Sequence, residues 1–127
     1  MTRPSVLLVE DDDDLRELEA QVIEDAGWRV WRAREGGEAL ELLERHGTPG
    51  VILLDMRMPG MDGWAFSRAL HRRFGNTIPL VVVSAAEDAG RWAAEVDADA
   101  VISKPFDLDH MLGTLEAFAP LEQPVAP

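Results

Sequence analysis

The sequence predicts a doubly wound α/β fold, and three observations carry this prediction. Short apolar runs rich in branched side chains recur along the chain, as in strands that are buried on both faces of a parallel sheet. Segments with the period of an amphipathic helix separate these runs, so that strand and helix alternate five times. The chain has 127 residues, 46% of them hydrophobic, which is enough for one domain with a real core.

Five segments are expected to form strands. The segment WRVWRA, residues 28–33, alternates apolar and basic residues, which is typical of an edge strand whose Trp28 and Trp31 are partly covered. The other four segments are mainly apolar and should be buried on both faces of the sheet; they are residues 5–9, 50–55, 78–84 and 99–103.

Five segments are expected to form helices. In the first, the period places Leu18 and Ile23 on one apolar face, and Gly27 ends the helix. In the last, Asp107 is a good N-cap and Leu108 should face inward. The predicted helices are residues 13–27, 36–47, 62–75, 87–96 and 107–118.

Composition limits the classes of function. The formal net charge is −12, which argues against direct nucleic-acid binding because phosphate contacts need clustered basic side chains. There are no cysteines, so a disulfide framework and a thiolate metal site are excluded. No apolar run is long enough to cross a bilayer, and the N-terminus lacks a signal-peptide layout, so we expect a cytoplasmic protein without membrane contact.

Polar side chains follow the ends of the four apolar strands. Glu10 and Asp11 follow the first, Asp55 ends the second, Ser84 the third, and Lys104 the fourth. Lys104 is the single lysine beside eleven arginines, which suggests a place that needs a compact ammonium. Each residue alone could be an ordinary polar strand end, but parallel strands bring their carboxyl ends to one edge of the sheet, where ligands bind.

The chemistry of such a cluster is specific. Several carboxylate oxygens in a small space suit Mg²⁺, which takes one or two carboxylates together with water and phosphate oxygens. With the metal in place, an aspartate can attack a phosphoryl group and form an acyl phosphate. An ammonium and a hydroxyl would then bind the oxygens of the phosphoryl group.

Four motifs follow one another along the chain: LLVEDDDDLREL, VILLDMRMPGMDGWAF, PLVVVSAAEDAG and DAVISKPFDLDHML. With these motifs in this order, the chain resembles the response-regulator receiver domain, the CheY-like fold of two-component signalling. The resemblance covers residues 5–118 and implies a five-stranded parallel sheet of order 2-1-3-4-5 flanked by five helices. Residues 1–119 would form the receiver domain, and the proline-rich residues 120–127 a tail or the start of a linker.

The resemblance assigns roles to the residues at the strand ends. Asp55 matches the phosphoacceptor, Ser84 the switch hydroxyl and Lys104 the phosphoryl contact, whose bond to Pro105 is usually cis in this family. Two positions depart from the family pattern. Val101 stands where an aromatic switch is common, and Asp97 where a glycine is common.

The resemblance also implies a metal site and separates two uses of the acidic run at residues 10–14. Glu10 and Asp11 would hold Mg²⁺ together with Asp55 and the backbone carbonyl of Arg57. The aspartates at positions 12–14 begin a helix, where free backbone N–H groups and the helix dipole favour negative side chains.

The implied function is a signalling phosphoacceptor rather than an enzyme with a separate substrate. A sensor histidine kinase or a phosphotransfer protein would donate the phosphoryl group to Asp55. Phosphorylation would alter the surface formed by residues 87–96, 99–103 and 107–118. This surface would then engage an output domain or protein, or a second copy of the chain.

Two alternatives stay open at this point. A phosphatase of the haloacid dehalogenase type also uses an aspartate nucleophile and Mg²⁺, but it needs a second aspartate two residues later, where this chain has Arg57. The other alternative is a receiver-like module that binds its partner without phosphorylation. The presence of the acidic pair, Ser84 and Lys104 argues against such a degenerate site.

Overall fold

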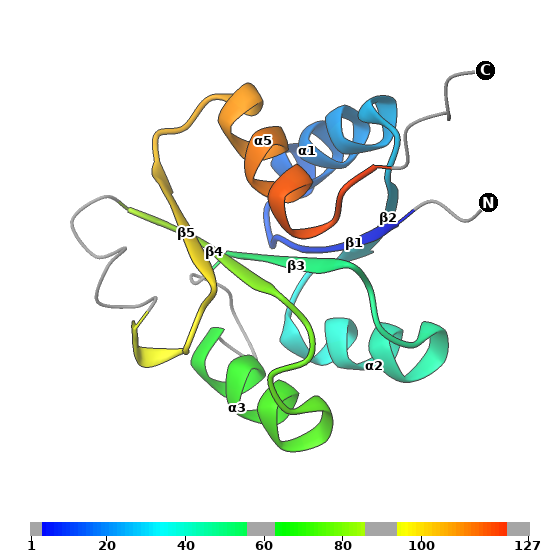
Figure 1. The fold of residues 1–127 in the computed structure, drawn as a ribbon, viewed down its shortest axis with the longest axis vertical. Helices are drawn as coiled ribbons and strands as arrows, with labels where there is room; N and C mark the ends of the chain where they lie inside the picture. Colours follow the sequence, from blue (N-terminus) through cyan, green and yellow to red (C-terminus); the bar gives the residue numbers. More distant parts are fainter. Residues whose placement is uncertain (1–3, 56–62, 86–93, 122–127) are drawn as a thin grey trace.

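The computed structural model describes residues 4–55, 63–85 and 94–121, and it contains the predicted parallel sheet. All neighbouring strands are parallel, and their order is β2-β1-β3-β4-β5, as the resemblance implies (Figure 1). The strand boundaries differ from the predicted ones by two residues at most. The strands are β1 (Ser5–Val9), β2 (Arg29–Ala33), β3 (Val51–Asp55), β4 (Leu80–Ala85) and β5 (Ala100–Lys104).

Helices cover both faces of the sheet. In Figure 1, α1 and α5 lie on one face, and α2 and α3 lie on the other. The helix expected at residues 87–96 falls mostly outside the described residues. None of the helices within the described ranges is long and apolar enough to span a membrane. The helices are α1 (Asp13–Ala26), α2 (Gly36–His46), α3 (Gly63–Phe74) and α5 (Leu108–Phe118).

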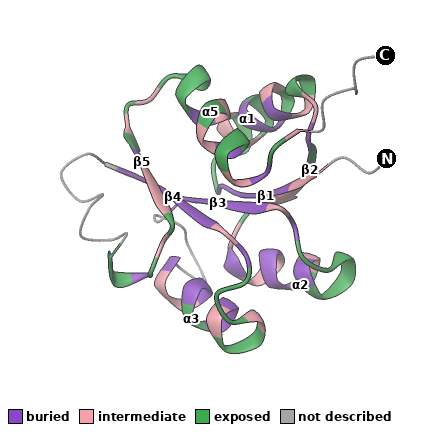
Figure 2. Cartoon of the chain, in the orientation of Figure 1, coloured by how far each residue is buried: buried purple, intermediate pink, exposed green. Residues whose placement is uncertain are grey.

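The sheet separates two apolar cores, because successive side chains of a strand point to opposite faces. The central strand β3 is buried throughout, as Figure 2 shows. The core under α1 and α5 includes Val6, Leu8, Leu53, Val81, Ile102 and Met111. The core under α2 and α3 includes Leu7, Ile52, Leu54, Leu40, Phe66 and Leu70.

Four predictions about burial were wrong, three of them because the residues are more exposed than expected. The strand at 99–103 is not buried on both faces, because β5 is an edge strand and only Ile102 within it is fully buried. Leu18 is 54% exposed and Leu108 is 36% exposed, so neither is a core residue. Leu108 is the first residue of α5, and Leu18 lies on the side of α1 away from the buried Ala20 and Ile23, because residues two or five apart face nearly opposite sides of a helix.

Trp28 is more deeply placed than its sequence context predicts. It precedes β2 rather than lying within it, and only 2% of the residue is exposed. Its indole Nε1 donates a hydrogen bond of 2.8 Å to the backbone carbonyl of Ala119, directly after α5. The side chain of Leu121 lies close over Gly27, so the segment after α5 packs on the turn between α1 and β2.

Replacing Trp28 with phenylalanine is expected to lower the free energy of unfolding by about 1–2 kcal/mol, because the buried Ala119 carbonyl loses its donor. Urea denaturation measures this loss. Trp31→Phe is the matched control, since Trp31 is half-buried and makes a ring contact with His46. An equal loss in both variants would contradict the role of the hydrogen bond.

Candidate functional site

The alternation of side chains along the strands brings three strand-end residues to one face of the sheet. Val6 and Leu8 of β1, and Leu53 of β3, belong to the core under α1 and α5. Glu10 and Asp55 lie two residues beyond Leu8 and Leu53, so they continue the same rows. Lys104 likewise lies two residues beyond Ile102 of β5. The parallel register places the ends of β1, β3 and β5 at the same edge of the sheet.

Glu10, Asp11 and Asp55 form a cluster of carboxylates. One oxygen from each lies within 4.8 Å of the others, close enough to hold a single metal ion. Glu10 and Asp55 are buried, whereas Asp11 is exposed. Carboxylate oxygens that are partly open to solvent fit Mg²⁺, which keeps several waters in its coordination shell.

Burial dominates the electrostatics of Glu10. Burial raises the pKa of Glu10 to about 8; the Asp12 backbone N–H lowers it, and the negative charge of Asp55 raises it further. That N–H donates to Glu10 Oε2 at 3.1 Å and so orients the carboxylate. A bound divalent cation would favour the ionised form of this group, so the donor set fits a metal.

Lys104 contacts the cluster, and Ser84 lies at the same edge of the sheet. Lys104 Nζ lies 3.4 Å from Asp55 Oδ2, and the Lys104–Pro105 peptide bond is cis, as the resemblance implies. Ser84 is only 2% exposed, and its hydroxyl has no hydrogen-bond partner among the described residues. Ser84 of β4 pairs in register with Ser103 of β5, the residue before Lys104, which places Ser84 at the same edge of the sheet.

The rest of the acidic run starts α1, as predicted. Asp12 is the N-cap, and its Oδ1 accepts a hydrogen bond of 2.8 Å from the Leu15 amide. Asp13 and Asp14 occupy the first turn, where the helix dipole stabilises negative charge. The five consecutive carboxylates therefore divide between the cluster and the helix cap.

Glu19 is a buried carboxyl that the sequence analysis missed. It lies in α1 with 3% exposure, four residues from both Leu15 and Ile23 and so on the same side of the helix. Burial, followed by the negative charge of Asp55, raises the pKa of Glu19 to about 7, and the positive charge of Lys104 acts in the opposite direction. The four-residue spacing was the signal available in the sequence.

The resemblance also named three positions outside the carboxylate cluster, Arg57, Asp97 and Val101. Arg57, whose carbonyl is the expected further metal ligand, lies outside the described residues. Asp97 has φ of 56°, a left-handed conformation that glycine adopts most easily, which explains the family preference there. Val101 lies half-buried in β5 and pairs with Val82 of β4.

Comparison with known proteins gives a consistent result. The family model of the response regulator receiver domain matches residues 6–116. The response regulator MprA of Mycobacterium sp. strain KMS is 33% identical over 128 residues, which cover 96% of this chain and 55% of that protein. The DNA-binding transcriptional regulator NtrC of Escherichia coli K12 is 34% identical over 91% of this chain and 25% of its own length.

Solved structures agree with the sequence comparison. The chemotaxis protein CheY4 of Vibrio cholerae superimposes with a TM-score of 0.82 at 27% identity, over 92% of this chain and 99% of that chain. A CheY-like receiver domain from Methanospirillum hungatei superimposes with a TM-score of 0.79 at 30% identity, over 91% of this chain and 93% of that chain.

The family match bears on the phosphatase alternative and on the extent of the likeness. The chain spans about half the length of MprA, so the likeness concerns the receiver part of that protein. A phosphatase of the haloacid dehalogenase type is not favoured, because both the family model and the solved structures place the chain elsewhere. The chain belongs to the response regulator receiver domain family of two-component signalling.

Proposed function

We propose that this chain is a phosphorylation-dependent switch in which Asp55 accepts a phosphoryl group from a phosphohistidine donor. The observation that carries the proposal is the meeting of three carboxylates and the Lys104 ammonium at the edge of the sheet where Ser84 also lies. A nucleophile, a cation site and two groups able to bind phosphoryl oxygens are what this transfer requires.

The transfer is a displacement at phosphorus. A carboxylate oxygen of Asp55 forms the new P–O bond, the P–N bond to the donor imidazole breaks, and its electron pair stays on the ring nitrogen. The product is a mixed anhydride of aspartic and phosphoric acid. Lys104, whose Nζ lies 3.4 Å from Asp55, neutralises charge on the phosphoryl oxygens, and the Ser84 hydroxyl donates a hydrogen bond to one of them.

Mg²⁺ is the proposed cofactor of this step. Glu10, Asp11 and Asp55, with the backbone carbonyl of Arg57, would hold it. When bound, it neutralises the negative charge of the carboxylates and the incoming phosphoryl group. In the absence of metal, the negative charges of Glu10 and Asp55 repel each other, and a bound Mg²⁺ would relieve this repulsion.

The partners follow from the same chemistry. A sensor histidine kinase or a phosphotransfer protein would supply the phosphoryl group in the cytoplasm. The output domain or protein would bind the surface that includes β5 and α5, and a second copy of the chain could occupy it after phosphorylation. The net charge of −12 argues that this chain does not itself bind nucleic acid.

Incubation with acetyl phosphate and Mg²⁺ tests the proposal without a cognate kinase. We expect intact mass spectrometry to detect one added phosphate in the wild type and none in Asp55→Asn, because the amide cannot act as the nucleophile. Omitting Mg²⁺ should also remove the adduct. An adduct of equal size in Asp55→Asn, or none in the wild type, would refute the proposal.

A further inference from the structure

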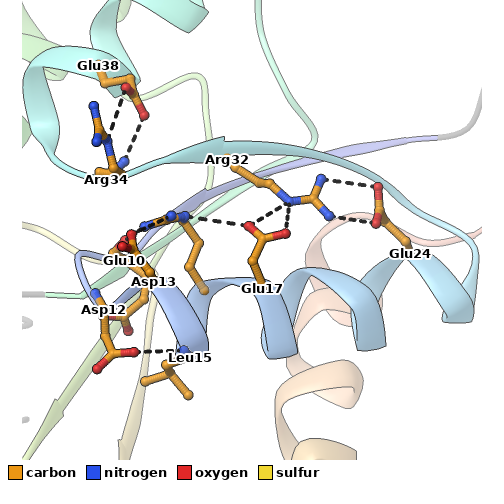
Figure 3. A network of polar contacts seen from close by, with 10 residues as sticks. Glu10, Asp12, Asp13, Leu15, Glu17, Glu24, Arg32, Arg34 and Glu38 are labelled. Atoms are coloured by element: carbon orange, nitrogen blue, oxygen red, sulfur yellow. Dashed lines mark hydrogen bonds and ion pairs between the residues drawn. The ribbon is translucent and has the colours of Figure 1, made fainter.

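Arg16 lies in the first turns of α1 next to the candidate metal site, and its side chain is only 11% exposed. Its Nη1 donates a hydrogen bond of 3.1 Å to the backbone carbonyl of Glu10. Its Nη2 contacts Asp13 Oδ1 at 2.7 Å, and its Nε lies 3.7 Å from Glu17 Oε2. Figure 3 shows these acidic residues around the start of the helix. The guanidinium is therefore fixed on several sides.

The Glu10 carbonyl belongs to the peptide unit that joins Glu10 to Asp11. Fixing this carbonyl fixes the plane of that peptide, because the peptide bond itself does not rotate freely. The orientation of the peptide in turn sets the directions in which the two side chains leave the backbone. Arg16 thus acts on the link between two of the three carboxylates in the cluster.

Other contacts hold the flanks of this peptide. The Glu10 amide donates to the Ala33 carbonyl of β2 at 3.0 Å, and the Asp12 amide donates to Glu10 Oε2 at 3.1 Å. These bonds act on the amide and carboxylate of Glu10, whereas Arg16 supplies a bond to its carbonyl. Loss of Arg16 should leave the strand end in place and loosen the peptide that follows it.

We infer that Arg16 is a positioning residue of the candidate metal site, which holds the Glu10–Asp11 peptide so that both carboxylates meet Asp55. The inference rests on the proposed function of this site. Arg16 touches neither the metal nor the phosphoryl group in this account and acts through the backbone. A planar guanidinium suits the role, because it can bind a carbonyl and two carboxylates at once.

A purely electrostatic role predicts the opposite sign. A cation beside the site repels Mg²⁺, so removing its charge alone would strengthen metal binding. Under that reading, Arg16→Met would bind Mg²⁺ more tightly and Arg16→Lys would bind it as the wild type does. A positioning role requires weaker binding in both variants, because neither methionine nor lysine reproduces the fork of donors.

The experiment is a calorimetric titration of the full chain with MgCl₂. We expect the dissociation constant for Mg²⁺ to rise by about tenfold in Arg16→Met and by a smaller factor in Arg16→Lys. Arg32→Met is the matched control. Arg32 belongs to the same network and binds Glu17 and Glu24, but among the described residues it makes no bond to residues 10–12 (Figure 3).

A second readout needs no metal. Amide hydrogen exchange of Asp12 and Leu15 without Mg²⁺ should be faster in Arg16→Met and unchanged in Arg32→Met, because only the former frees the peptide before the cap. Wild-type Mg²⁺ affinity in both Arg16 variants, or tighter binding in Arg16→Met, would overturn the inference. Failure of the wild type to accept phosphate at Asp55 would instead refute the proposed function, so the two failures are distinguishable.

Discussion

Replacing Asp11 with alanine is expected to lower the rate of Mg²⁺-dependent phosphorylation of Asp55 by at least about 100-fold. Asp11 is the exposed member of the three-carboxylate cluster, so its carboxylate is the one most accessible to a hydrated cation. Without it, Glu10 and Asp55 would share the metal with fewer protein ligands. Time courses of the acetyl phosphate reaction, followed by mass spectrometry across a range of MgCl₂ concentrations, measure the effect.

Asp14→Ala provides the control for this change. Asp14 is also an exposed aspartate of the acidic run, but it lies in the first turn of α1, where it interacts with the helix dipole. Its loss should cost about 0.3–1 kcal/mol of stability and leave phosphorylation unchanged. If both variants lost phosphorylation equally, the division of the run into metal ligands and helix cap would be wrong.

Replacing Glu19 with glutamine is expected to stabilise the metal-free protein at pH 8 but not at pH 4.5. Burial and the charge of Asp55 raise the pKa of Glu19 from 4.5 to about 7 in the folded chain. The folded state therefore binds the proton more tightly than the unfolded state does. The contribution of Glu19 to stability is fully present below pH 4.5 and is lost as the pH rises to about 7.

The size of this effect follows from the proton affinity. A tenfold change in affinity corresponds to about 1.4 kcal/mol, so the penalty above pH 7 is on the order of 3 kcal/mol. Glutamine has nearly the same shape and carries no charge, so Glu19→Gln should lack this loss of stability. Urea denaturation of both proteins between pH 4.5 and 8, in a metal-free buffer, measures the difference.

Glu41→Gln is a matched control for Glu19, because Glu41 is exposed on α2 and belongs to neither core. Its unfolding free energy should follow the wild-type dependence on pH. Glu10 also titrates in this range, but it is present in all three proteins. Parallel curves for wild type and Glu19→Gln would show that Glu19 is not a buried titrating group.

The meeting of polar residues at the strand ends was predictable from the sequence because it depends on a simple rule. Parallel strands end at one edge of the sheet, and the residues that follow their apolar runs must meet there. Glu10, Asp55 and Lys104 could therefore be placed together before any coordinates were known. The order of the strands came from the resemblance to a family, since an apolar run does not identify its neighbours in the sheet.

The failures concern residues whose surroundings are set by tertiary packing. Periodicity placed Leu18 of α1 on the apolar face, but Leu18 is exposed, and Glu19, for which no role was expected, is buried instead. The reason is the angle at which the helix meets the sheet, which its own sequence does not specify. The link from Arg16 to the Glu10 carbonyl was equally hidden, because backbone acceptors have no sequence signature.

The account depends most directly on the site of phosphorylation, and borohydride reduction can locate it. An acyl phosphate on an aspartate is reduced to homoserine, so peptide mass mapping can identify the residue that carried the phosphate. After incubation with acetyl phosphate and Mg²⁺, we expect homoserine at position 55 and at no other aspartate, and none when Mg²⁺ is omitted. Unmodified Asp55, or homoserine at another position in the wild type, would contradict the account.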